Sequence, residues 1–382
     1  MRNTLAEIFY FEWRVFRSII FQNLIHFQWK RFFLTLAFIV VILFISLLTV
    51  LLRLADEIFY RNYRKTEVRQ PVFIISNPRS GTTYLHRLLC LDEERFTYFL
   101  LYHTFLPSVT FYRFILLLKK VDKRLNWPLK RFFTRVEERV FAGWKDIHPM
   151  GFEESEEDEG LFVLSLMSPA IGLICPWFKE MKWLWIPDRL SPAKKEAMMA
   201  YYRNTIQRFM YAWGQDKIFL SKNVISTGRM EMLLSAFPDA KIIYPVRHPY
   251  QTIPSVTSMF SAPWKVLADD LSEKSQEYRA WGALSQEFYM HLYKMMERLE
   301  PDQLFYVDYE EFINNPKKIV LELYQKFGWP VNVQFLERLE QQTSHNKKYR
   351  SNHNYSLEQY GYRKEEVYYN LQPVFKKFGF EP

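Results

Sequence analysis

The chain has 382 residues, of which 49% are hydrophobic and 18% aromatic, so it can bury a large core and is not intrinsically disordered. Lysine and arginine outnumber acidic residues by 51 to 42, and this net charge of +9 favours anionic partners, either lipid headgroups or a polyanionic ligand. With only two cysteines, Cys90 and Cys175, the sequence excludes a disulfide framework and a zinc site built on cysteines.

The N-terminal region predicts attachment to a membrane. Residues 1–31 are aromatic and basic and are interpreted as an amphipathic segment. Residues 32–52 carry no charge and as a helix would be about 30 Å long, which predicts a transmembrane helix. A buried core helix is the alternative. Five basic residues precede this run and five follow it within the polar connector 53–70, so the positive-inside rule gives no orientation.

Beyond the connector, short apolar runs alternate with helical patterns. Strands are predicted at 72–76, 217–221, 241–246 and 304–308. This alternation predicts an α/β fold, with a parallel β-sheet flanked by helices, in one domain that spans 71–382. The long stretch between the first two strands is mostly helical and is interpreted as a large helical insertion or lid, in which Ser191-Pro192 marks a helix start.

A phosphate-binding turn is predicted where the first strand passes into a helix, at Ser-Asn-Pro-Arg-Ser-Gly-Thr-Thr (76–83). A glycine permits the tight turn, and the backbone N–H groups at a helix N-terminus attract an anion. Arg79 adds a full charge, and two threonine hydroxyls can donate hydrogen bonds. A P-loop for nucleoside triphosphates would have lysine where this chain has Thr82, and an ordinary strand–helix turn is the alternative.

The stretch PVFIISNPRSGTTYLHRLL (71–89) resembles the 5′-phosphosulfate-binding loop of sulfotransferases, enzymes that use 3′-phosphoadenosine 5′-phosphosulfate (PAPS) and release 3′,5′-ADP. The resemblance implies a P-loop-type sheet. It also implies that the loop holds the 5′-phosphate and the sulfuryl group of PAPS through Arg79, Ser80, Gly81, Thr82 and Thr83.

A second motif, KIIYPVRHPYQTIPSV (241–256), is similar to the 3′-phosphate motif of the same family and implies that Arg247 and Ser255 bind that phosphate. Two such motifs in the right order, each after a strand, rarely arise together by chance. Similarity continues to residue 382. It places Lys222 at a strand end, where it can stabilise charge on the donor, and HNYSLEQYGYRKEEV (353–367) resembles the closing segment of the bacterial branch called sulfotransferase family 3, with His353 and Tyr355 facing the nucleotide.

Sulfuryl transfer to a hydroxyl group needs a base that takes up the hydroxyl proton. This base is expected in HPMGFEESEEDEG (148–160), where six of the seven residues from 153 to 159 are acidic. One crowded glutamate there would have a raised pKa, whereas a solvated acidic helix start is the alternative. By resemblance, Glu157 and Glu159 are the best matches, with His148 as helper or rival. Ser155 replaces a proline common in that branch, so the alignment of this acidic run with the motif of that branch can shift by a residue or two.

The acceptor is expected to be a lipid-like or membrane-borne alcohol, because a membrane anchor accompanies the aromatic and basic stretch 111–133. That stretch could instead form part of the core and its solvated surface. Neither a metal nor a nucleic-acid partner is expected. The alternatives to a sulfotransferase are a P-loop-type kinase and a non-catalytic membrane adaptor. The expected location is a single-pass protein of the bacterial inner membrane with a cytoplasmic catalytic domain, and a Golgi type II protein is the alternative.

Overall fold

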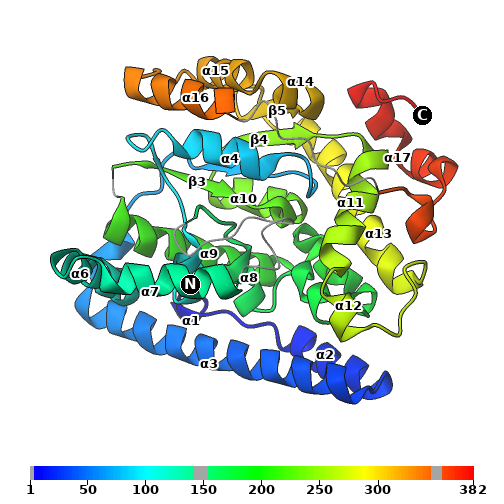
Figure 1. The fold of residues 1–382 in the computed structure, drawn as a ribbon, viewed down its shortest axis with the longest axis horizontal. Helices are drawn as coiled ribbons and strands as arrows, with labels where there is room; N and C mark the ends of the chain where they lie inside the picture. Colours follow the sequence, from blue (N-terminus) through cyan, green and yellow to red (C-terminus); the bar gives the residue numbers. More distant parts are fainter. Residues whose placement is uncertain (1–3, 141–153, 215, 346–354) are drawn as a thin grey trace.

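A five-stranded parallel sheet with strand order β2-β3-β1-β4-β5 lies at the centre of the computed structural model, which describes residues 4–140, 154–214, 216–345 and 355–382 (Figure 1). The strands are β1 Val72–Ile74, β2 Phe96–Thr97, β3 Ile218–Lys222, β4 Lys241–Val246 and β5 Leu304–Asp308. Four of them match the predicted strands within two residues at each end. The short edge strand β2 was not predicted.

Alternate residues of β1 enter two separate cores. Val72 and Ile74 pack with α4 (Thr82–Cys90), α15 (Pro316–Lys326) and α16 (Val333–His345), which lie with α14 (Tyr309–Asn314) on one face of the sheet (Figure 1). Phe73 and Ile75 enter the core on the opposite face, which is built from α9, α10, α11, α13 and α17 (Pro192–Trp213, Met230–Ala236, Pro249–Ser261, Gln276–Met295 and Lys364–Phe378). Both faces of the parallel sheet are therefore covered, which explains the continuous apolar runs of its strands.

The stretch between β1 and β3 is largely helical, as predicted. It contains α4 and then α5 Leu101–Phe105, α6 Val109–Arg124, α7 Pro128–Val140, α8 Glu159–Leu164 and α9. Helix α9 begins at Pro192 after the N-cap Ser191, as its sequence indicated. Its buried side chains, among them Tyr202 and Phe209, are part of the main core, so α9 supports the sheet and does not form a lid.

The N-terminal region consists of α1 (Thr4–Ile8), α2 (Trp13–Ile25) and α3 (Trp29–Phe59), and α12 (Trp264–Leu267) lies near α3. Helix α3 contains the predicted span and is long and apolar enough to cross a membrane, with a mean hydropathy of 3.0 over its most apolar window. It continues past Leu52 to Phe59, and one of its faces packs against the rest of the protein along the lower edge of the molecule (Figure 1).

Candidate active site

The predicted phosphate loop joins β1 to α4. Gly81 is the N-cap of α4 with φ +78°, a backbone conformation that favours glycine, and a Cβ there would lie 3.3 Å from the ring of Tyr309, which is a tight contact. The hydroxyl of Ser80 is buried and finds no hydrogen-bond partner among the described residues. The Ser76 hydroxyl donates to the carbonyl of Pro245 at 2.5 Å and fixes the loop to β4. The loop is thus held in place, with an unsatisfied buried donor of the kind that a phosphate oxygen accepts from.

The second predicted motif meets this loop directly. Arg247 follows β4, and its Nη1 donates to the carbonyl of Arg79 at 2.8 Å. The Nε of Arg79 donates in turn to the hydroxyl of Ser255 on α11 at 3.1 Å. Tyr309 lies beneath both motifs, with its ring centroid 4.4 Å from the Arg247 guanidinium carbon. Tyr309 follows β5 directly, and the sequence did not indicate that it lies at this site.

The end of β3 brings a predicted lysine and a predicted glutamate to the same loop. The Nζ of the buried Lys222 lies 3.3 Å from the hydroxyl of Thr83 and 2.8 Å from Oε1 of Glu157. Glu156 lies behind this pair, with an oxygen 3.9 Å from the lysine. Lys222 therefore connects the helix that follows the phosphate loop with the acidic segment.

The other described members of the acidic run have separate partners, and Glu156, Asp158 and Glu159 are buried, so most of this run is not a solvated surface. Glu154 pairs with Arg87 of α4 at 3.2 Å. Asp158 is buried and accepts hydrogen bonds from Asn223 at 2.7 Å, from Ser221 at 2.8 Å and from the Tyr202 hydroxyl. Burial raises the pKa of Asp158 to about 6, although these three donors oppose the shift. A raised pKa was expected for a glutamate of this run, whereas the carboxyl group with the raised pKa is that of Asp158, which is enclosed by donors.

Glu159 pairs with an arginine that follows β3. Its two oxygens accept from Nη1 and Nη2 of Arg229 at 2.7 and 2.6 Å, and both side chains are buried. The guanidinium carbon of Arg229 also lies 3.8 Å from the ring centroid of Phe162. Both oxygens of Glu159 are therefore occupied by a fixed cation.

A family model described as the sulfotransferase family matches residues 71–333. The chain belongs to the sulfotransferase family. Two relatives, from Mycobacterium bovis and Mycobacterium tuberculosis, are named omega-hydroxy-beta-dihydromenaquinone-9 sulfotransferase Stf3. Each is 26% identical over 340 residues, which cover 82% of this chain and 78% of the relative.

Solved structures of the family show the same fold. Sulfotransferase STF9 from Mycobacterium avium superposes with a TM-score of 0.71 at 18% identity, over 86% of this chain and 81% of that chain. Sulfotransferase STF1 from Mycobacterium tuberculosis gives a TM-score of 0.65 at 21% identity, over 86% and 84% of the two chains. The fold expected from the two motifs is therefore confirmed.

The buried pair in this sulfotransferase predicts a large loss of stability from Glu159→Ala, because Arg229 would remain buried without its counter-charge. We expect the free energy of unfolding, measured by urea denaturation, to fall by about 3–5 kcal/mol. The control Glu154→Ala breaks a pair whose side chains are 32% and 54% exposed and should cost less than about 1 kcal/mol. Unchanged stability together with lost sulfate transfer would instead make Glu159 a reacting carboxylate.

Two histidines and one tyrosine, His148, His353 and Tyr355, were also predicted as site residues of the sulfotransferase. His148 and His353 lie outside the described residues. Tyr355 is half-buried at the start of the C-terminal segment, near Tyr360, whose pKa is raised by burial and, more weakly, by Tyr355. His86 of α4 is buried, and burial together with the charge of Lys222 lowers its pKa to about 3, which keeps its ring neutral.

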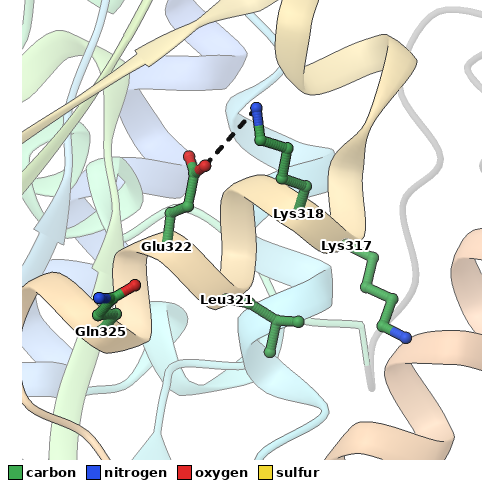
Figure 2. Close-up of a pocket in the computed structure, with 5 residues that line it drawn as sticks. All are labelled: Lys317, Lys318, Leu321, Glu322 and Gln325. Carbon is green, nitrogen blue, oxygen red and sulfur yellow. Dashed lines mark ion pairs between the residues drawn. The ribbon is translucent and has the colours of Figure 1, made fainter.

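A surface hollow of about 410 Å³ lies away from the phosphate loop, on one side of α15. Figure 2 shows its lining side chains along this single helix, with Lys318 and Glu322 paired at 3.6 Å. The lining residues are Lys317, Lys318, Leu321, Glu322 and Gln325. None of them belongs to either phosphate motif or to the acidic run, so this hollow carries no part of the catalytic assignment.

Proposed function

We propose that this sulfotransferase takes its sulfuryl group from PAPS. The unsatisfied hydroxyl of Ser80, the backbone at Gly81 and the N-terminus of α4 suit the 5′-phosphosulfate. Arg247 and Ser255, which the structure brings to Arg79, suit the 3′-phosphate. PAPS supplies an electrophilic sulfur, and 3′,5′-ADP is the nucleotide product.

In the proposed reaction, the oxygen of an acceptor hydroxyl attacks the sulfur in line, and the bond from sulfur to the bridging phosphate oxygen breaks. The electron pair of that bond stays on the phosphate of 3′,5′-ADP, and the hydroxyl proton passes to Glu157. Lys222 stabilises the negative charge that develops on the leaving phosphate oxygen. The observation that carries this proposal is the position of Lys222 Nζ, which lies between Thr83 and Glu157.

The proposed acceptor is a hydroxyl of a lipid-like molecule. The relatives that match 82% of this chain are named for a hydroxylated menaquinone, a lipid-like alcohol. The long apolar helix α3 is compatible with an enzyme that meets such a substrate at a membrane. We also infer a bacterial inner-membrane location with a cytoplasmic catalytic domain, which the bacterial relatives and the two free, buried cysteines support.

The nucleotide assignment predicts that 3′,5′-ADP raises the melting temperature without magnesium. At one hundred times its dissociation constant, a ligand stabilises the native state by about 2.7 kcal/mol, which corresponds to a shift on the order of 5 °C for a domain of this size. Differential scanning fluorimetry measures this shift. No response to millimolar 3′,5′-ADP, combined with a magnesium-dependent response to ATP, would favour a kinase instead.

Transfer itself is tested by incubating the protein with sulfur-labelled PAPS and a total lipid and metabolite extract, followed by identification of the labelled product. A labelled lipid supports the proposed acceptor, whereas a labelled water-soluble product would replace it with another hydroxyl compound. Nucleotide binding without transfer to any component of the extract would indicate a non-catalytic membrane adaptor.

A further inference from the structure

Helix α3 has its polar residues on the inside and its apolar residues on the outside. Eight of its side chains are buried against the rest of the protein, at intervals of three or four residues that form one continuous stripe. Six of these eight are polar or charged: Arg31, Thr35, Ser46, Thr49, Arg53 and Asp56. An amphipathic helix on a water-soluble protein has the opposite arrangement.

The outer face of α3 is correspondingly apolar. Thirteen of its large apolar side chains are 38–75% exposed, and Lys30 is the only charged residue among the exposed positions of this helix. These side chains leave on the order of 1,000 Å² of apolar surface, more than the ~300–600 Å² of the largest patch on a typical soluble monomer. Such a surface needs a non-aqueous partner.

The buried polar residues near the C-terminal end of α3 bind the catalytic domain firmly. Arg53 donates to the side chain of Asn204 at 3.1 Å. Asp56 accepts from the backbone N–H of Thr110 at 2.8 Å and pairs with Arg208 at 2.9 Å, and both members of this ion pair are fully buried. Detaching this end would leave buried charges without partners, at a cost of several kcal/mol.

Contacts with the domain continue to the other end of the helix. Ser46 donates to the carbonyl of Leu164 in α8 at 3.3 Å, and Arg31 pairs with Asp270 at 3.0 Å. From Arg31 to Asp56 the helix rises about 38 Å, more than the ~30 Å thickness of the hydrocarbon core of a bilayer. If α3 crossed the bilayer in this structure, the domain beside it would lie within the hydrocarbon. The contacts therefore fit a helix that lies parallel to the membrane surface.

Neighbouring helices carry further exposed apolar side chains. Helices α2 and α6 contact α3, and α7 follows α6 (Figure 1). They add exposed side chains of the same kind, among them Trp13, Phe21, Phe114, Leu117, Phe132 and Phe133. We call the exposed apolar residues of α2, α3, α6 and α7 the apolar platform.

The charge beside the platform identifies its partner. Residues 109–140, which include α6 and α7, contain nine lysines and arginines and three acidic residues. One of the three acids, Asp122, is buried and accepts from the backbone N–H groups of Leu129 and Lys130 at 2.7 and 3.0 Å. A second copy placed symmetrically on the platform would bring two basic segments together, whereas anionic lipid headgroups complement them.

We propose that this protein is monotopic: the apolar platform is immersed in one leaflet of a bilayer with anionic lipid, and α3 lies in the membrane plane without crossing it. This modifies the single-pass topology that the charge-free run of residues 32–52 suggested. The placement depends on the contacts of α3 and not on the proposed sulfate chemistry, so membrane binding and transfer are tested separately.

Flotation of the full chain with lipid vesicles tests the surface. We expect binding to phosphatidylcholine vesicles that contain phosphatidylglycerol and weaker binding to phosphatidylcholine alone. Raising the salt from ~0.1 to ~1 M shortens the Debye length from about 10 to about 3 Å and should reduce this difference. The double substitution Phe44→Glu and Leu47→Glu, at positions 66% and 59% exposed, should weaken binding roughly tenfold or more. Val333→Glu, at a position 72% exposed on α16, is the matched control and should leave vesicle binding unchanged.

Labelling with a membrane-impermeant maleimide tests the topology. The substitutions Lys30→Cys and Arg61→Cys, made separately, place a thiol at each end of α3, while the native Cys90 and Cys175 are buried. Equal labelling of both sites from outside sealed vesicles supports the in-plane helix. Labelling of only one site before detergent is added means that the helix spans the bilayer, and this would overturn the proposal. A stable dimer that does not bind vesicles would overturn it in favour of a second copy on the platform.

Discussion

Replacement of Glu157 by glutamine is expected to abolish sulfate transfer and leave 3′,5′-ADP binding intact. Glutamine keeps the size of the side chain and an oxygen that can face Lys222, now 2.8 Å from the carboxylate, but it cannot take up the acceptor's proton. Loss of a general base lowers the rate by about 10²–10⁴-fold. The rate is measured with saturating PAPS and acceptor, and the dissociation constant of 3′,5′-ADP by calorimetry.

The matched control is Glu154→Gln, a substitution in the same acidic run at a side chain that pairs with Arg87 near the surface. It should keep most of the activity. If Glu157→Gln were as active as this control, the base would be another group. If it lost nucleotide binding as well, Glu157 would act by shaping the phosphate loop and not by accepting a proton.

Arg247→Ala should remove the preference of the protein for a 3′-phosphate. Its guanidinium is the charged group proposed for that phosphate, whereas the 5′-phosphate belongs to the loop around Gly81. A hydrogen bond between charged groups contributes about 1.5–3 kcal/mol, so the affinity for 3′,5′-ADP should fall roughly 10- to 150-fold. The affinity for 5′-AMP, which lacks the 3′-phosphate, should change little. Calorimetric titration of both nucleotides measures the difference.

Because Arg247 also donates to the carbonyl of Arg79, its loss can disturb the loop itself. Ser255→Ala provides a second comparison, since it removes the other proposed ligand of the 3′-phosphate and its contact with the Arg79 side chain, but leaves the bond from Arg247 to the Arg79 carbonyl in place. It should lower the affinity for 3′,5′-ADP severalfold and leave the affinity for 5′-AMP unchanged. An equal loss of affinity for both nucleotides in both variants would contradict the assignment of these residues to the 3′-phosphate.

The strands that hold this site could be predicted from the sequence because strands buried on both faces are apolar runs with clear ends. The ranges 241–246 and 304–308 agree with β4 and β5 as observed. Strand β2 has two residues at the sheet edge, too few for any periodicity to appear, and it was missed. The order of the strands also had to come from the structure, because it depends on pairing between segments far apart in the chain.

Within the acidic run, the sequence could not distinguish one carboxylate from the next. Their roles depend on side chains supplied by distant segments. Arg229 forms an ion pair with Glu159, and Asn223 donates a hydrogen bond to Asp158. Lys222 forms an ion pair with Glu157. Each of these partners lies more than 60 residues further along the chain. No local pattern encodes such pairings, although each partner follows or ends β3 and is therefore carried to the same edge of the sheet.

Helix α3 shows a different limit of sequence reasoning. Average hydropathy identified an apolar helix but carries no information on which face is apolar. The spacing of Thr35, Ser46, Thr49 and Arg53 does contain that information, because these residues fall on one stripe. Their burial could then be expected only if the helix packed against a folded domain.

The polar stripe of α3 also affects the order of events during synthesis. The partners of Arg53 on α9 follow it by 151 and 152 residues, so at translation rates of ~5–20 residues per second they emerge from the ribosome roughly 8–30 s later. Throughout that interval the nascent helix lacks the α9 side chains that accept hydrogen bonds from Arg53 in the folded protein. A helix adsorbed flat on the membrane would shelter its apolar side and keep Arg53 in water, ready for the domain that folds onto it.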